Sequence, residues 1–317
     1  MIEGVTLTSP ALAELLRFKI PVSLLAWNGR YLGGFLPATN AHGLARVRQY
    51  QRTLDPGFAR DSAAKILHAK LYNQRRVLQR LLAARTAAAR VESDVPPADA
   101  PPAPEQPALE DKLNNLGIKQ AVTWLDGFFN SMAKASSLEE LRGYEGAATA
   151  RYFQTWASFL PAEFPFERRS TRPPLNPVNA CISFGSTLVY SEIVAFVHAH
   201  GLDPALGLLH ATTDGRWSLA LDLLEPFRPA LVEPLALDLF SRAMLDHDHF
   251  ESRDGGVFLN ESGRAKFFLQ YERRMERQFM SEAAGCRTTL RQQLEHQAVM
   301  FKSALERPDL FAPFLMN

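Results

Sequence analysis

The stretch from Phe58 to Arg90 contains neither glycine nor proline, and no other feature of the sequence constrains the fold so strongly. Apolar residues recur along it at helical spacing, which predicts one long helix. Helical patterns also fill most of the chain after Thr39, so the sequence predicts a mainly α-helical protein. The apolar residues of the long helix are Ile66, Leu67, Leu71, Leu78, Leu81 and Leu82.

A proline-rich segment interrupts the helical part. Between Pro96 and Pro107, six of the twelve residues are proline. This composition is typical of flexible or polyproline linkers, and we expect a flexible insertion at about 92–108. The apolar segment 176–200 is expected to be a buried central helix. Further helices are expected at 109–135, 138–160, 218–224, 226–245, 262–280 and 288–305, with a small hairpin around Gly255–Phe258.

The first 38 residues have a different pattern. Val5–Leu7 is strand-like, 11–18 is helical, and Asn28-Gly29 between two apolar runs predicts a β-hairpin. One hairpin, one helix and one further strand make a poor independent unit. Either these strands complete a sheet made by something else, or the chain begins within a domain. We expect a small, incomplete β-domain at 1–38 and an all-helical domain at 39–317.

Composition excludes several classes of protein. Lys and Arg number 35 against 34 Asp and Glu, a net charge of +1, and 46% of the residues are hydrophobic. Disordered, collagen-like and disulfide-stapled secreted chains differ from this composition. Cys181 and Cys286 lie far apart without zinc-site spacing. No signal-peptide pattern is present and no apolar run reaches the roughly 18 residues that span a membrane, so we expect an intracellular protein without membrane contact.

Basic residues are concentrated on the long helix. Between Phe58 and Arg90 there are eight Lys and Arg and one acid, Asp61, a local net charge of +7. Their spacing wraps the charges around the helix. Two interpretations stay open, a solvated helix surface or sequence-independent contacts with nucleic-acid phosphates.

Polar residues in apolar surroundings are candidates for chemistry. Glu145 has glycines on either side, at Gly143 and Gly146, which leave room for another element or a ligand. His210 follows an apolar run. Each of these two residues also fits a structural role, as an exposed helix glutamate and as a core or capping histidine.

A pair of acids follows in the segment Trp217–Pro229. Asp222 and Glu225 share one helix face at a spacing of three residues. Two acids in so apolar a segment need a cation, which is either Arg228 or a metal ion. Carboxylates and an imidazole from three separate helices could hold Mg²⁺ or Mn²⁺. With the basic helix, this set points to metal-assisted phosphoryl transfer on a nucleic acid.

Three strings in this order resemble the CRISPR-associated integrases of the Cas1 family: Leu141–Ala148, Gly207–His210 and Ser218–Pro229. Gly255–Asn260 is similar to that family's C-terminal block, and the piece from Lys19 to Gly33 is similar to the end of its β-domain. The resemblance covers nearly the whole chain. It implies a small β-domain followed by an all-helical catalytic domain.

The resemblance also implies roles for individual residues. Glu145, His210 and Glu225 would bind the metal, Mg²⁺ or Mn²⁺, and carry catalysis. Asp222 would be a neighbouring acid, with Arg228 and Tyr190 near the site. The implied reaction is spacer acquisition, in which the 3′-hydroxyl of a short DNA attacks a phosphodiester at a repeat. The expected phosphate contacts are Arg60, Lys65, Arg75, Arg76, Arg80 and Arg274.

The implied partners are double-stranded DNA, as spacer precursor and as repeat, a second copy in a homodimer, and a Cas2 protein, in the cytoplasm of a prokaryotic cell. A fused reverse transcriptase or Cas4 nuclease is also compatible. The sequence departs from the family in two places: Ser183–Ser186 replaces an Asn-Tyr-Gly-Tyr string, and the β-domain is short. We therefore expect a fragment, a fusion module or a diverged member. Two alternative functions stay open, a non-catalytic DNA-binding and dimerisation module, or an integrase of a transposon-like element.

Overall fold

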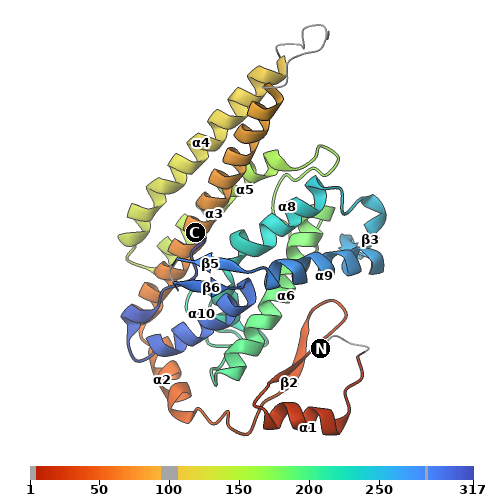
Figure 1. The fold of residues 1–317 in the computed structure, drawn as a ribbon. Helices are drawn as coiled ribbons and strands as arrows, with labels where there is room; N and C mark the ends of the chain where they lie inside the picture. The colour runs from red at the N-terminus through yellow and green to blue at the C-terminus, as the bar shows by residue number, and fades with distance from the viewer. Residues whose placement is uncertain (1–4, 94–105, 283–284) are drawn as a thin grey trace.

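Helices dominate the molecule, as the sequence predicts, in a computed structural model that describes residues 5–93, 106–282 and 285–317. The glycine-free and proline-free run forms α3 (Pro56–Ser93). It pairs with α4 (Gln106–Ala133), and these two helices extend well beyond the rest of the molecule (Figure 1). α5 (Leu138–Trp156) packs against both of them. The predicted insertion at 92–108 falls mainly on 94–105, which lie outside the described residues.

The central helix of the fold is α6 (Pro177–Ala199), which begins where Asn176 accepts a hydrogen bond from the amide of Asn179. It packs against α7 (Ser218–Leu224), α8 (Glu233–Ser241) and α10 (Leu290–Ala304). Between α7 and α8, residues 228–232 form a short π-helical turn. The prediction of a buried central helix is confirmed.

α6 also corrects one expectation. Within the described residues it is the one helix long and apolar enough to cross a membrane, with an 18-residue window of mean hydropathy 1.6. Such a window was not expected from the sequence. Because 61% of that window is buried inside the molecule, α6 is better explained as a core helix than as a membrane span.

The described strands form three separate two-stranded antiparallel sheets. The first is the predicted hairpin of β1 (Val22–Leu25) and β2 (Tyr31–Phe35), whose turn requires glycine because Gly29 has φ +78°. The second, β3 (Phe250–Arg253) and β4 (Gly256–Leu259), confirms the expected turn there. The third, β5 (Phe279–Ser281) and β6 (Cys286–Thr288), was not predicted. The strand expected at Val5–Leu7 is wrong, since these residues are irregular.

The N-terminal part lies beside the lower end of α6 (Figure 1). The amide of Tyr31 donates to Ser191 Oγ at 3.1 Å, and that hydroxyl donates to the carbonyl of Gly29 at 2.8 Å. α1 (Ser9–Arg17) precedes the hairpin and α2 (Gly43–Thr53) follows it. The division into domains at 1–38 and 39–317 stays a prediction.

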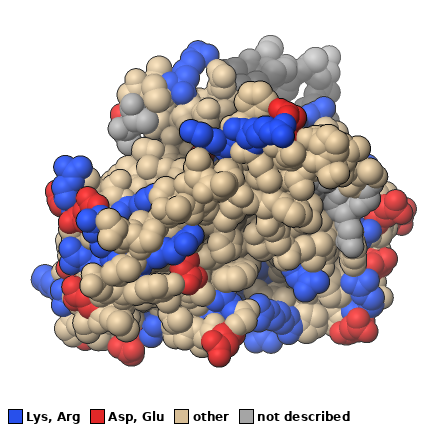
Figure 2. Space-filling model, turned by 90° about the horizontal axis from the view of Figure 1, so that it is seen from below, with Lys and Arg blue, Asp and Glu red and all other residues tan. Residues whose placement is uncertain are grey.

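The lower face of the molecule carries these N-terminal elements. Seen from below, its Lys and Arg form separate groups with Asp and Glu among them, around a largely uncharged middle (Figure 2). Large apolar side chains are exposed on α1 and α2 or directly after them, including Phe18, Leu44 and Leu54. This face therefore offers no continuous basic field for a nucleic acid.

The C-terminal part completes the core. α9 (Glu261–Glu276) packs against α8 and α10, and the chain after α10 returns to α3. There the side-chain amide of Asn73 donates to the carbonyls of Pro226 and Phe314 at 2.8 and 2.9 Å. Phe314 also stacks on the fully buried Phe227. The segment after α7 is thus fixed against the long helix.

Candidate functional site

Three of the predicted site residues meet in one cavity of about 490 Å³. Glu145 comes from α5, His210 from the loop between α6 and α7, and Glu225 from the C-terminal end of α7. Three segments of the chain therefore converge, but the expectation of three helices is wrong for His210, which lies in a loop. The residues that line the cavity are Arg142, Glu145, Leu209, His210, Ala211, Arg216 and Glu225.

Asp222 holds the loop that carries His210, between α6 and α7, in place. We call this segment the histidine loop. Its carboxylate is fully buried and accepts hydrogen bonds from the amides of Leu208, Leu209 and His210 at 2.5, 3.1 and 2.9 Å. It also lies 2.6 Å from His210 Nδ1. A carboxylate at Nδ1 favours the imidazole tautomer with its proton on that nitrogen, and in this tautomer Nε2 can bind a cation.

The histidine loop also depends on a glycine. A Cβ on Gly207 would lie 2.1 Å from the carbonyl oxygen of His210 and 2.6 Å from Ser218 Cβ. No side chain fits in that space, so glycine is needed for the tight return of the chain. The "Gly-Leu-Leu-His" string thus has a local steric reason.

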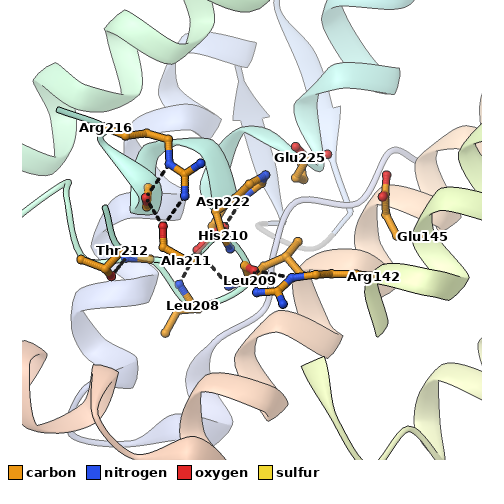
Figure 3. Close-up of polar contacts among 12 residues, drawn as sticks. Arg142, Glu145, Leu208, Leu209, His210, Ala211, Thr212, Arg216, Asp222 and Glu225 are labelled. Atoms are coloured by element: carbon orange, nitrogen blue, oxygen red, sulfur yellow. Dashed lines mark hydrogen bonds and ion pairs between the residues drawn. The ribbon is translucent and has the colours of Figure 1, made fainter. Parts of the chain in front are cut away.

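Two arginines hold the same loop from its flanks (Figure 3). Arg142 reaches from α5 and donates twice to the carbonyl of Leu209, at 3.1 and 2.6 Å. Arg216 donates to the carbonyl of Ala211 and to Ser218 Oγ. The result is an ordered loop with two guanidinium groups at the wall of the cavity.

A lysine that the sequence analysis did not select lies between the two glutamates. Lys70 Nζ is 2.5 Å from Glu145 Oε1 and 2.6 Å from Glu225 Oε2. Glu145 also accepts from Thr149 Oγ1 at 2.9 Å, and Glu225 accepts from Arg228 Nε at 2.9 Å. Lys70 and Arg228 together compensate the buried carboxylate of Glu225, so the ion-pair explanation for Glu225 and Arg228 is correct for that pair.

The electrostatics of the site keep Glu225 ionised. Burial alone would raise the pKa of its carboxyl, but Arg228 and Lys70 outweigh burial and lower that pKa to about 2. Burial likewise acts to lower the pKa of Lys70, whereas Glu225 and Glu145 raise it above its ordinary value. The site is therefore a charged cluster at neutral pH.

The donor set fits a divalent cation. Two carboxylates and a free imidazole Nε2 are ligands that Mg²⁺ or Mn²⁺ accept. The two carboxylates already hold one cation, the Lys70 ammonium. Among the described residues, no three His, Cys, Asp or Glu side chains lie close enough together to hold an ion as they stand. The fit therefore requires both that the ammonium moves and that the three side chains come closer together.

Other sequence predictions about this site have mixed outcomes. Tyr190 does not line the cavity, since its hydroxyl accepts a hydrogen bond from the amide of Trp217 at 3.2 Å. No other protein element packs closely against Gly143 or Gly146, because a Cβ at either position would meet nothing within 4 Å. The space beside Glu145 is open.

The six predicted phosphate contacts all have partners within the chain. Arg60 pairs with Asp61, Lys65 with the carbonyl of Pro308, and Arg75 with Asp126. The remaining three lie toward the C-terminal segment: Arg76 and Arg80 both donate to the backbone oxygen of Asn317, and Arg274 pairs with Asp238.

Two of these six residues line a second cavity, of about 560 Å³, between α3, α8, α9 and the C-terminal segment. We call it the arginine groove. Its guanidinium groups outnumber its one carboxylate, that of Asp238. The pKa of Arg274 is lowered, first by burial and also by its neighbours Arg277 and Arg242. The arginines of the groove are Arg80, Arg242, Arg273, Arg274 and Arg277.

Comparison with known proteins gives a consistent result. A family model described as CRISPR associated protein Cas1 matches residues 1–98 and 106–273. A CRISPR-associated endonuclease Cas1 of Thermus thermophilus is 40% identical over 182 residues, which cover 57% of this chain and 57% of that protein. A Cas4 exonuclease and Cas1 endonuclease fusion of Geobacter sulfurreducens is 33% identical over 92% of this chain and 49% of its own length. The chain thus spans about half the length of these curated relatives.

Solved structures with the same fold include the Cas1 part of a "Partial Cas6-RT-Cas1--Cas2 complex". It matches with a TM-score of 0.73 and 27% identity, over 98% of this chain and 86% of that chain. A casposase bound to an integration product matches with a TM-score of 0.69 over 98% of this chain and 84% of that one. Its identity is 22%, so that likeness concerns the fold alone.

Proposed function

The chain belongs to the CRISPR-associated Cas1 family, and on that premise we propose that it is a divalent-metal-dependent DNA integrase and endonuclease of CRISPR adaptation. It would insert short DNA segments at a repeat by attack of a 3′-hydroxyl on a phosphodiester. One observation carries the proposal: Glu145, His210 and Glu225, from three separate segments, line a single cavity.

Each side chain has a distinct task in this proposal. Glu145 and Glu225 would hold Mg²⁺ or Mn²⁺ through carboxylate oxygens, and His210 would contribute Nε2. The bound ion would supply Lewis-acid stabilisation of charge on phosphate oxygens. Asp222 fixes the imidazole through Nδ1, and Arg228 keeps Glu225 ionised and oriented.

The cavity wall suits a phosphodiester. Arg142 and Arg216 place guanidinium groups beside the catalytic acids, and guanidinium groups recognise phosphate oxygens through paired hydrogen bonds. Both side chains are already fixed by bonds to the histidine loop. Substrate binding would therefore cost little conformational entropy in the side chains of Arg142 and Arg216.

The proposed partners are double-stranded DNA, a second copy of this chain and a Cas2 protein. The solved complex that matches this chain contains Cas2 and a reverse transcriptase, and one relative is fused to a Cas4 exonuclease. A fusion to either enzyme is therefore compatible with the proposal. The same function implies the cytoplasm of a prokaryotic cell.

Two alternatives have some support. One alternative is a non-catalytic DNA-binding module of a larger fusion protein. It agrees with the match to the Cas4 and Cas1 fusion, of which this chain covers 49%. An integrase of a transposon-like element agrees with the shared fold of a casposase. The arrangement of catalytic side chains favours activity over the first alternative, because a scaffold needs no carboxylates in a cavity.

The test is a strand-transfer assay. A labelled short duplex and a repeat-containing plasmid are incubated with Mn²⁺, with and without a Cas2 protein. We expect joined product from the wild type and at least a 100-fold loss in Glu145→Ala, His210→Ala and Glu225→Ala. Glu163→Ala, at an exposed site away from the cavity, is the matched control. DNA binding by the wild type without joining would instead support the scaffold.

A further inference from the structure

Lys70 is the most enclosed cation of the site. Its side chain is 6% exposed, the same fraction as that of Glu225. It projects from α3 beside Ile66, Leu67 and Leu71, which are fully buried. Its position is therefore a core position, at which an ammonium is tolerated only with charged partners.

Glu225 and Glu145 contact Lys70 in different ways. Glu225 Oε2 is buried, and its partner is the Lys70 ammonium at 2.6 Å. Its other oxygen is held by Arg228. Glu145 Oε1 meets Lys70 and Thr149. If the ammonium leaves, one carboxylate oxygen on each glutamate faces the same small space.

The other charges of the site do not compete for that space. Asp222 is occupied by three backbone amides and by His210 Nδ1. Arg228 donates to the far oxygen of Glu225 and to Ser186. Lys70 is thus the one cation of the described site that bridges both proposed metal-binding glutamates.

We propose that Lys70 is a built-in counter-cation that competes with the divalent metal for Glu145 and Glu225 and that must be displaced for the metal to bind. It holds the two carboxylates in place in the metal-free protein. This inference rests on the proposed metal centre. Lys70 is a positioning residue in this scheme, since it acts through the two glutamates.

The experiment measures Mn²⁺ binding to metal-stripped protein by calorimetry. A second measurement follows the loss of the electron paramagnetic resonance signal of free Mn²⁺. Lys70→Met removes the charge and keeps the length of the side chain. We expect it to bind Mn²⁺ at least ten-fold more tightly than the wild type. Lys70→Arg keeps a competing cation and should stay within about three-fold of the wild type. Lys119→Met, at an exposed position on α4, is the matched control and should not change affinity.

Thermal unfolding separates this role from a merely structural one. Without metal, Lys70→Met should melt below the wild type, because the buried carboxylate of Glu225 and the part-buried carboxylate of Glu145 lose their shared partner. Saturating Mn²⁺ should restore its melting temperature to that of the metal-loaded wild type. A deficit that persists with metal would assign Lys70 to packing alone and overturn the inference.

The outcomes distinguish this inference from the proposed function. If wild type and Lys70→Met bind Mn²⁺ equally, or Lys70→Met binds more weakly, the counter-cation role is wrong and the metal centre stands. If neither binds Mn²⁺, the metal centre itself fails, and this inference fails with it. Glu145→Gln should abolish the gain produced by Lys70→Met, which localises the effect to this pair of side chains.

Discussion

Asp222 and Glu225 lie three residues apart, yet their carboxylates have different partners. From sequence, both acids were expected to need a cation. Asp222 instead accepts hydrogen bonds from three backbone amides and lies 2.6 Å from His210 Nδ1. Glu225 takes two cations, Lys70 and Arg228. The difference arises because Asp222 points under the histidine loop, a contact that periodicity along one helix does not reveal.

A second buried acid lies outside the candidate site and makes a prediction about pH. Glu233, at the start of α8, is 2% exposed. Burial raises the pKa of its carboxyl to about 7, against the lowering effects of Tyr152, Lys70 and Arg228. A folded-state pKa above the unfolded value stabilises the protein at low pH, and this stability is lost as pH rises through 7.

Replacement of Glu233 by Gln should remove that pH dependence. Between pH 4.5 and pH 8 the wild type should lose about 3 kcal/mol of unfolding free energy at this residue. Glu233→Gln should therefore be more stable than the wild type at pH 8 and similar to it below pH 5. Denaturant unfolding across this pH range measures the difference, with Glu163→Gln as an exposed control. Parallel curves for wild type and Glu233→Gln would refute the assignment.

At the scale of elements, the histidine loop makes the clearest prediction. Gly207→Ala would place a methyl group against the carbonyl of His210 and force the loop away from Asp222. We expect about 1–3 kcal/mol of destabilisation and a weaker Mn²⁺ affinity. Gly143→Ala is the matched control, since its Cβ meets nothing and alanine favours a helix by up to about 1 kcal/mol. Equal melting temperatures for the two variants would contradict this account.

The long elements were predictable because their signals are local. α3, α5 and α6 have helical periodicity, an N-terminal cap or an uninterrupted run, all readable without knowledge of contacts. β5 and β6 are three residues each, too short for an alternating pattern. Val5–Leu7 has strand composition but no strand partner in the described structure, and composition alone does not make a sheet.

The site was predictable only in part for a similar reason. Glu145, His210 and the pair of Asp222 and Glu225 are each unusual in their own segments, and the resemblance to the Cas1 family is what singled out Glu225 within the pair. Lys70 was counted among the surface charges of the long helix. Its position between Leu67 and Leu71, on the apolar side of that helix, was a usable signal. What sequence could not supply is that two acids from other helices meet it there.

At the scale of the whole molecule, the net charge of +1 hides how the charges are arranged. The basic residues of α3 have partners in several different elements of the chain. The arginine groove is the larger concentration of unbalanced guanidinium groups. For the DNA binding proposed above, we expect the backbone contacts in this groove.

The groove therefore predicts a salt-dependent contribution to DNA binding. Arg242→Ala and Arg277→Ala should each weaken binding about equally for unrelated duplexes. Each should also reduce the slope of log affinity against log salt concentration by about one. Arg17→Ala, on α1, is the control, since its side chain is exposed and paired with Glu14. Fluorescence anisotropy across a salt series measures both quantities. Unchanged affinity in both groove variants would remove the groove from the DNA path.

The continuity of α3 has a consequence for how this chain can change in evolution. Lys70 lies at the proposed metal site, and Val77 and Leu81 line the arginine groove on nearly the same face of the helix. Seven residues of helix set these two places about 10 Å apart. One inserted or deleted residue between them would rotate one place away from the other by about 100°. Substitutions along α3 are thus far easier to accommodate than any change in its length, because the length of the helix between these residues fixes both the distance and the relative orientation of the two places.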